Sequence, residues 1–362
     1  MITAKFGGTA VTPQNLRYIK QILTPCHKIV VVSAVGKEYK EDVKTTDLLR
    51  QYYENPQDYV WNAICDKYRR LVEVNGIAVD VEALLADAKQ RATSYGVEYC
   101  MSLGEELSAK VVASFLNATY LEAEEIVRFN SGKCDYELTY RNVQNALTGV
   151  DLAVVGGFYG GENGNRQTFS RGGSDVTGAI FAAATNSTLY ENWTDVYGVS
   201  VANPTKVHNV ATVDSMSYNE MFLLSLAGAE VLHPDAVAPV EALSIPIKIG
   251  NFFNPNGAST LISSCPSSNK LLSIAEKVVD GKVVTTALHS YPRWQIMRLV
   301  SKFFQQNTAK IQFFDSEREF SSLKVYDLEF SDNMVRITTD LSILVQLYKT
   351  LIEGEQSAYF SS

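Results

Sequence analysis

The sequence has few of the residues that build disulfide frameworks, zinc sites or membrane spans. Its five cysteines are odd in number, scattered along the chain and without a CxxC pair. That pattern indicates reduced thiols rather than a disulfide framework or a zinc site. No apolar run reaches the roughly 18 residues that a transmembrane helix needs, and no apolar leader precedes the first expected strand. These absences predict a cytoplasmic protein that does not associate with a membrane.

An excess of basic residues is also absent. Lys and Arg total 32 against 40 Asp and Glu, which gives a net charge of −8. This balance argues against a general nucleic-acid-binding surface, although a few local cations can still hold a small anion. The hydrophobic share of 46% and the charged share of 20% are ordinary for a globular protein, and 362 residues favour two domains.

Apolar runs that end in glycine or polar residues alternate with helical patterns over the first part of the chain. We expect strands at residues 2–6, 28–33, 151–158, 189–196 and 245–249, a helical insertion at about 52–98, and a polar loop at 160–167. The alternation predicts an α/β fold, a three-layer αβα sandwich around a largely parallel sheet. In such sheets, ligands bind beyond the carboxyl ends of the strands.

The composition changes near residue 259. Residues 259–270 are rich in serine and predict a linker. The following residues predict strands near 282–289, 311–314, 323–330 and 335–339, with helices near 293–304 and 341–352. That order is typical of a small α+β ferredoxin-like domain. We therefore expect one domain at 1–265 and a second at 271–362.

One stretch, residues 169–180, gathers the features of an anion site. The glycine pair at 172–173 can adopt positive φ and approach a ligand closely. The apolar residues that follow repeat at helical spacing, so Ser174 and Asp175 are expected in the first turn of a helix. Arg171 stands just before that turn. A cation, two glycines and a helix N-terminus are typical of an anion cradle, but an ordinary capped helix has the same pattern.

Other polar residues are expected at the same edge of the sheet. Lys5 ends a strand before two glycines, but the GxxxxGK[ST] order of a P-loop is absent. Gly157 and the pair Thr194 and Asp195 also follow strands. Glu105 stands three residues after Ser102, which fits a capping box, while a glutamate at a loop–helix junction also suits the binding of an ammonium group. The convergence predicts a ligand site.

Taken in order, these segments resemble those of aspartate kinases in the amino acid kinase superfamily. The matching segments lie at 5–9, 102–105, 169–175, 193–196, 231–234 and 251–255. The resemblance covers residues 1 to about 263 and implies that this part is a catalytic domain with the amino acid kinase fold. It implies transfer of the γ-phosphoryl group of ATP, with Mg²⁺, to the β-carboxylate of L-aspartate. That reaction opens the aspartate-family pathway to amino acids such as lysine and threonine.

The resemblance also implies a role for each matching residue. A carboxylate is already a nucleophile at pH 7, so catalysis would rest on positioning and on neutralising the phosphoryl group. Lys5 would supply that cation and Asp175 would orient it. Arg171 would bind the α-carboxylate of aspartate and Glu105 its α-ammonium. The remaining implied contacts are Thr46 and Ser174 to aspartate, and Gly7, Gly8, Thr9, Gly157, Thr194, Asp195 and Lys206 to the nucleotide. No side chain is predicted to be a metal ligand.

The sequence departs from the family pattern at two nucleotide contacts. Thr205 replaces the arginine of an Asp-Pro-Arg turn, and Glu230 replaces a lysine. Each charge-assisted hydrogen bond contributes about 1.5–3 kcal/mol, so both losses should weaken nucleotide binding unless Lys206 restores one. The departures leave two alternatives to an aspartate kinase open. One is a catalytically weak regulatory or interaction paralogue, and the other is a kinase of a related amino-acid carboxylate.

The C-terminal region resembles a single regulatory ACT domain, whereas family members that carry such domains usually have two. Residues 288–292 lack the glycine expected where an ACT strand meets its helix and binds an amino acid. This absence argues against feedback inhibition by lysine or threonine, and the alternative is a purely structural or dimerising role. We expect a homodimer that binds the small molecules aspartate and ATP, and neither nucleic acid nor a membrane.

Overall fold

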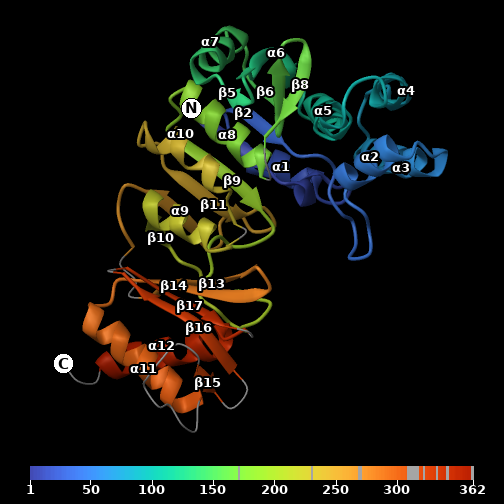
Figure 1. Ribbon diagram of the computed structural model, residues 1–362. Helices are drawn as coiled ribbons and strands as arrows, with labels where there is room; N and C mark the ends of the chain where they lie inside the picture. Colours follow the sequence, from blue (N-terminus) through green and yellow to red (C-terminus); the bar gives the residue numbers. More distant parts are fainter. Residues whose placement is uncertain are drawn as a thin grey trace. The chain divides into compact units, whose positions relative to one another are not determined.

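The computed structural model describes residues 1–169, 172–229, 231–267, 271–307, 318–320, 323–331, 333–339 and 342–359. The chain divides into two compact units (Figure 1). The first consists of Met1–Tyr197 and Asp235–Leu261, and the second of Gly198–Pro234 and Ile262–Ser362. The domain boundary expected between residues 265 and 271 stays a prediction, since contacts group residues 198–234 with the C-terminal part.

A parallel sheet forms the centre of the first unit. Six of its strands pair in parallel in the order β11-β9-β1-β2-β6-β3. Their bounds are β1 (Ile2–Phe6), β2 (His27–Val32), β3 (Thr119–Leu121), β6 (Ala153–Gly156), β9 (Leu189–Thr194) and β11 (Ile247–Asn251). The central strands are buried almost throughout, as expected of parallel strands that helices cover on both faces.

Alternate residues of β2 belong to two different cores. Val30 and Val32 lie in a cluster with residues of the helices α1 (Leu16–Ile22) and α5 (Val97–Leu116). Ile29 and Val31 lie in a cluster with residues of α7 (Tyr136–Ala146) and α8 (Gly173–Ala184). Because successive strand residues point to opposite faces, the sheet is covered on both sides. The predicted three-layer αβα fold is confirmed.

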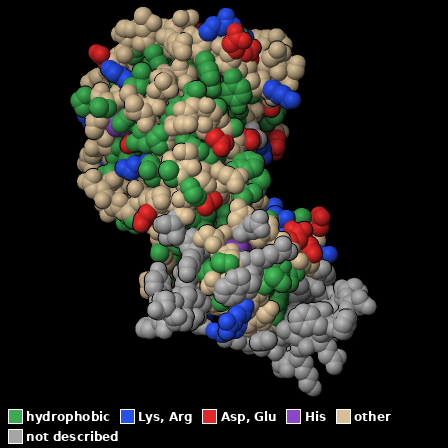
Figure 2. All heavy atoms as spheres, turned by 90° about the vertical axis from the view of Figure 1, so that its left-hand side faces the viewer, with side chains coloured by type: hydrophobic (Ala, Val, Ile, Leu, Met, Phe, Trp, Pro, Cys, Tyr) green, Lys and Arg blue, Asp and Glu red, His purple; other side chains and the backbone are tan. Residues whose placement is uncertain are grey.

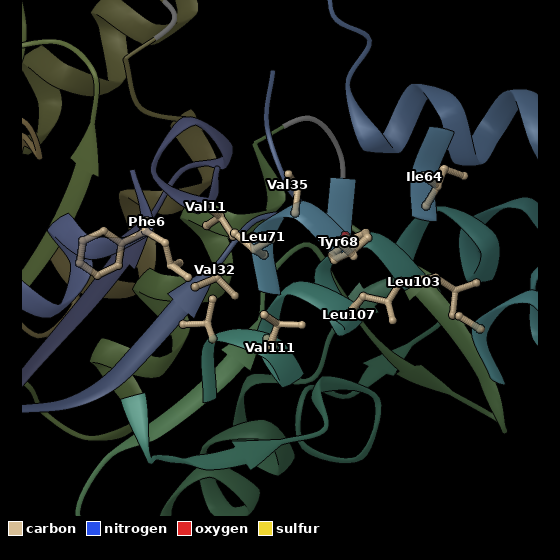
Figure 3. Close-up of a cluster of buried hydrophobic side chains, with 14 of the residues drawn as sticks. Phe6, Val11, Val32, Val35, Ile64, Tyr68, Leu71, Leu103, Leu107 and Val111 are labelled. Atoms are coloured by element: carbon tan, nitrogen blue, oxygen red, sulfur yellow. The ribbon is translucent and has the colours of Figure 1, made fainter. Parts of the chain in front are cut away.

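A group of helices extends the first core. The stretch expected as a helical insertion contains α3 (Asp58–Asn75) and α4 (Val81–Ala92), and α2 (Thr45–Glu54) precedes it. Figure 3 shows that side chains of α3 and α5, including Tyr68 and Leu107, meet in one apolar cluster. The Tyr68 hydroxyl donates to the Gly104 carbonyl at 2.7 Å. This bond and the apolar cluster fix α3 against α5.

Three local predictions up to residue 270 are wrong. The capping box at Ser102 is absent, because α5 begins at Val97 and the Ser102 hydroxyl donates to the carbonyl of Tyr99. Residues 160–167 form most of a hairpin, β7 (Tyr159–Glu162) and β8 (Asn165–Thr168), rather than a loop. The predicted linker at 259–270 begins with a strand, β12 (Ser259–Ser263).

The second unit has an antiparallel sheet with the order β13-β14-β17-β16-β15. Its elements are β13 (Leu271–Val279), β14 (Lys282–His289), α11 (Arg293–Asn307), β15 (Arg318–Phe320), β16 (Leu323–Phe330), β17 (Met334–Thr339) and α12 (Leu344–Tyr359). The two helices pack on each other, and the predicted α+β ACT-like fold is confirmed. The sequence did not predict β13. The strand expected at 311–314 lies outside the described residues.

The remaining elements are short. They are η1 (Gly8–Val11), α6 (Ala123–Ile126), β4 (Phe129–Asn130), β5 (Lys133–Cys134), β10 (Ser215–Ser217), α9 (Tyr218–Leu226), η2 (Pro234–Ala236) and α10 (Ala238–Glu241). No helix in the described part of the chain is long and apolar enough to cross a membrane. On the face that Figure 2 shows, Lys and Arg side chains are scattered among acidic and uncharged ones.

Candidate functional site

A buried polar triad lies near the carboxyl ends of β1 and β9. Lys5 and Asn192 are register partners on these neighbouring strands. The Lys5 ammonium lies 2.7 Å from a carboxylate oxygen of Asp175 and donates to the Asn192 side-chain oxygen at 3.3 Å. The Asn192 amide in turn donates to Asp175 at 3.1 Å. Lys5 is only 9% exposed, so the triad holds its single cation in one place.

Asp175 reaches this triad from the first turn of α8. Gly172, with φ of 76°, precedes the helix, which begins at Gly173. This is the glycine turn that the sequence predicts, and it places Ser174 and Asp175 in the first turn. The Tyr190 hydroxyl donates to the Asp175 carbonyl at 2.9 Å and ties the turn to β9. Arg171, the predicted partner of the substrate α-carboxylate, lies outside the described residues.

Gly7 and Gly157 have packing roles in addition to the phosphate contacts that the resemblance implies. The Gly7 amide donates to the Trp193 carbonyl at 3.2 Å, and the Gly157 amide donates to the Val32 carbonyl at 2.9 Å. A Cβ on Gly157 would lie 2.7 Å from the Cα of Ser174. Gly157 therefore allows the end of β6 to approach the first turn of α8, and its contact with phosphate stays a prediction.

A cavity of about 710 Å³ lies within the first unit. Predicted site residues that line it are Gly8, Thr9, Thr46, Glu105 and Asp195. The rest of its wall comes from residues 33–40 and 44–45. The structure thus brings together residues from four separate segments of the sequence. Ser33 and Thr45 also line the cavity and were not among the predicted site residues.

Glu105 is a buried carboxylate that faces this cavity. It is 4% exposed, and its Oε2 has no hydrogen-bond partner among the described residues. Burial raises the pKa of Glu105 to about 8, against a smaller lowering by the backbone amide of Ala34. A Cβ on Gly104 would lie 2.8 Å from the Cβ of Ala34, so this glycine lets α5 approach the cavity wall. A buried carboxylate without a countercharge suits a ligand that brings a cation.

Glu106, the next residue, has the opposite environment. Its carboxylate pairs with Arg166 at 2.7 Å, Arg91 at 2.8 Å and Lys110 at 2.6 Å. Burial raises the pKa of Glu106, but the hydrogen bond from Arg91 and the charges of Arg166 and Lys110 lower it to about 2. Glu106 is therefore a firmly ionised anchor of α5. Sequence reasoning missed this network, because its partners come from α4, α5 and the β7–β8 hairpin.

Asp195 joins three segments at the rim of the site. The hydroxyls of Thr9 and Thr194 donate to its carboxylate at 3.4 and 3.2 Å, and the Asn251 side-chain amide donates to its carbonyl at 3.1 Å. The structure thus links η1 to the ends of β9 and β11. Thr194 and Asp195 were predicted to line a nucleotide site, and they do lie beside Thr9.

The predicted nucleotide contact Lys206 has a different partner in the structure. Its ammonium lies 2.7 Å from a carboxylate oxygen of Glu276, whose side chain is 4% exposed. Burial raises the pKa of Glu276, but the Lys206 hydrogen bond and two hydroxyl donors lower it below its usual value. Thr205 bonds to the side chain of Asn203. Glu230 lies outside the described residues, and a nucleotide contact of Lys206 stays a prediction.

Known proteins resemble this chain over most of its length. A sequence model described as "Amino acid kinase family" matches residues 1–251. Aspartokinase 3 of Bacillus subtilis is 32% identical over 290 residues, 73% of this chain and 64% of that protein. The lysine-sensitive aspartokinase 3 of Escherichia coli is 28% identical over 293 residues, 72% of this chain and 64% of that protein. The chain thus spans about 64% of the length of these relatives.

Solved structures give the same result for the fold. The aspartate kinase of Clostridium acetobutylicum superimposes with a TM-score of 0.71 and 29% identity, covering 99% of this chain and 82% of that one. Aspartokinase III of E. coli in complex with aspartate and ADP gives a TM-score of 0.69 and 21% identity, covering 94% of this chain and 79% of that one. Because the identity to the E. coli structure is only 21%, this similarity concerns the fold alone.

Proposed function

The chain belongs to the amino acid kinase family, and from this premise we propose that it phosphorylates the β-carboxylate of L-aspartate with ATP. The product would be 4-phospho-L-aspartate, the first intermediate of the pathway to amino acids such as lysine and threonine. The observation that carries the proposal is the buried carboxylate of Glu105, which has no countercharge and whose Oε2 has no hydrogen-bond partner among the described residues, in a cavity lined by residues of the kinase motifs. An amino-acid substrate brings the ammonium group that this carboxylate lacks.

The acceptor side of the site would consist of Glu105, Thr46 and Ser174. Glu105 would bind the α-ammonium of aspartate, and Thr46 lines the same cavity. Ser174 and the helix N-terminus behind it favour an anion. Arg171 is proposed, from the family motif alone, to bind the α-carboxylate. The β-carboxylate is already a nucleophile at pH 7, so no general base is needed.

Lys5 is proposed to stabilise the negative charge on the transferring phosphoryl group. Asp175 and Asn192 hold its ammonium group within 2.7 and 3.3 Å, which fixes the cation before substrate binds. A preorganised cation of this kind contributes about 3 kcal/mol to transition-state stabilisation. Gly7, Gly8, Thr9 and Thr194 would lie beside the ATP phosphates.

Mg²⁺ is proposed to arrive with ATP and to neutralise its phosphates. The ion usually keeps several waters and needs only one or two protein carboxylates besides phosphate oxygens. Of the carboxylates that line the cavity, Glu38 pairs with Arg70 and Glu105 is proposed for the substrate ammonium. Asp195 is therefore the residue whose chemistry fits a contact with the ion.

Trapping the acyl phosphate tests this function directly. Purified protein is incubated with ATP, Mg²⁺ and aspartate, and hydroxylamine converts the product to a coloured hydroxamate. We expect product with the wild-type chain and at least a hundredfold less with Lys5→Met. No product at high protein concentration, alongside a working aspartokinase, would refute the proposal. A panel of glutamate and other amino-acid carboxylates decides whether aspartate gives the highest kcat/KM.

A catalytically weak interaction paralogue is the second candidate. The pairing of Lys206 with Glu276 favours it, because Lys206, the cation that would replace the missing arginine, is engaged in that pair. ATP binding measured by calorimetric titration, together with turnover by the isolated chain, would eliminate this candidate.

We also propose that the ACT-like unit serves in forming a homodimer rather than in sensing lysine or threonine. Light scattering measures the dimer, and assays with each amino acid test inhibition.

A further inference from the structure

The segment 36–44, here called the lysine loop, forms one wall of the cavity. Lys37, Lys40 and Lys44 are exposed and line the cavity. No hydrogen bond or ion pair joins their ammonium groups to another residue in the described part of the chain. The same loop also carries the acids Glu38, Glu41 and Asp42, so its charges sum to zero. What matters is where each charge points.

The Asp42 carboxylate is turned away from the cavity and toward α3. Lys67 of α3 donates to it at 2.5 Å, and also to the Gly36 carbonyl at 3.3 Å. The backbone amides of Glu38 and Val43 donate to the same carboxylate at 2.9 and 2.8 Å. The side chains of Lys67 and Asp42 are only 7% and 12% exposed. This pair therefore ties both ends of the loop to one helix.

Glu38 is neutralised by the same helix. Arg70, one turn after Lys67, lies 2.9 Å from the Glu38 carboxylate, and Gln14 donates to it at 3.0 Å. The Glu38 side chain is 6% exposed. Glu41, the third acid, is exposed but does not line the cavity. Helix α3 thus neutralises the two buried acids and leaves the loop's three lysines at the cavity.

The position of α3 is itself fixed beside the site. Tyr68, next to Lys67, donates to the carbonyl of Gly104, the residue before Glu105. Tyr68 and Leu71 pack into the apolar cluster shared with α5 (Figure 3). The helix that orders the lysine loop and the helix that carries Glu105 therefore behave as one rigid support.

We propose that the lysine loop is an anion-binding wall of this cavity and that Lys67 is its positioning residue. The ligand class is a small dianion, a dicarboxylate or a phosphoryl group. The inference deepens the proposed function and rests on it, because the acceptor and the phosphorylated product of that function are small anions of this class. Lys67 contacts no ligand itself. It acts by holding the Asp42 carboxylate away from the three lysines, which would otherwise be partly neutralised.

The test is the binding of inorganic phosphate and of succinate, measured by calorimetry at low and at moderate salt. Lys67→Met removes the charge and keeps the length of the side chain, and we expect at least fivefold weaker binding of both anions. Lys67→Arg should restore binding, and so should the double variant Lys67→Met/Asp42→Asn, because it also removes the released carboxylate. A merely structural role of Lys67 would not give that second rescue.

A triple variant keeps the test valid if Lys67→Met fails to fold. Lys37→Gln, Lys40→Gln and Lys44→Gln together should weaken anion binding at least fivefold and flatten its salt dependence. Lys133→Gln is the matched control, because Lys133 is exposed but lies outside the cavity. Unchanged anion binding in the triple variant overturns the inference, and so does the absence of anion binding to the wild-type chain.

Kinase assays separate this inference from the proposed function. In an active enzyme, Lys67→Met should raise KM for aspartate at least fivefold and change kcat much less. If phosphate and succinate bind and respond to the variants while no acyl phosphate forms, the inference stands and the proposed function fails. If the enzyme is active but neither anion affinity nor KM changes, the inference fails and the proposed function stands.

Discussion

Two adjacent glutamates give the sharpest prediction, because the same substitution should change stability in opposite directions. Glu105 is buried without a countercharge and its pKa is raised to about 8, whereas Glu106 is paired with three cations and its pKa is lowered to about 2. Glu105→Gln removes a charge that the fold disfavours. Glu106→Gln removes a charge that the fold requires. Both variants replace one carboxylate oxygen by an amino group, at neighbouring positions of α5.

The sign and size for Glu105 follow from linkage. Its pKa is about 8 in the fold against 4.5 in the unfolded chain, so the unfolded chain releases its proton first as pH rises. The free energy of unfolding therefore has no penalty from Glu105 below pH 4.5, and it falls between about pH 4.5 and 8. The difference in pKa corresponds to an upper limit of roughly 5 kcal/mol above pH 8. Glu105→Gln should lack this loss and be more stable than wild type at pH 8.5.

For Glu106 the order is reversed. The unfolded chain holds its proton to higher pH, so the carboxylate stabilises the fold above pH 4.5 and this contribution is lost as pH falls toward 2. Glu106→Gln also removes the 2.7 Å ion pair with the buried Arg166, which keeps the carboxylates of Glu122 and Glu124 as partners. Breaking a buried pair costs about 3–5 kcal/mol when the remaining charge has no other partner, so this range is the upper limit here. We expect a clear loss of stability at pH 7 and above.

Urea denaturation between pH 4.5 and 8.5 measures both effects, and calorimetry adds a functional readout. An ammonium group needs the ionised form of Glu105, so the affinity for aspartate should rise about tenfold per pH unit between pH 6 and 8. Glu105→Gln should remove both the binding and its pH dependence. Equal stability changes in the two variants, or pH-independent aspartate binding by wild type, would refute the reasoning.

Other predictions concern the proposed catalytic cation, the close approach of Gly157 to α8, and the second unit. Lys5→Met should lower kcat by a hundredfold or more, about 3 kcal/mol, with little change in KM for aspartate. Hydroxamate assays measure both parameters. A change in KM alone would contradict a role of Lys5 in stabilising the transition state. Gly157→Ala should lower the free energy of unfolding, measured by urea denaturation, by about 1–3 kcal/mol, because the new Cβ would lie 2.7 Å from atoms of helix α8. Gly96→Ala is the control and should not lower it, because open space surrounds Gly96. Lys206→Met should destabilise the fold, because the buried Glu276 carboxylate loses its paired cation and keeps the hydroxyl donors Thr285 and Ser342. The affinity for ADP should be unchanged; weaker ADP binding would instead assign Lys206 to the nucleotide.

Several features could be predicted from sequence because they depend on local patterns. The apolar runs of β1, β2 and β6 indicate buried parallel strands, and the glycines at 172–173 mark the start of α8. Two hairpins carry signals that sequence reasoning overlooked. Asn163-Gly164 and Asp280-Gly281 turn between paired strands, with positive φ at all four residues. Asn-Gly and Asp-Gly are the residue pairs that such tight turns favour.

The sequence by itself determined the fold class, the family and the segments that meet at the site. Only the tertiary structure decided what each charge at that site does. Asn192 meets Lys5 through strand register between residues 187 positions apart. Glu105 and Glu106 differ because one faces a cavity and the other meets cations from three elements. The lysines of 36–44 line the cavity because α3 binds the neighbouring acids. Burial and pairing between distant segments set these properties, and local sequence patterns contain neither.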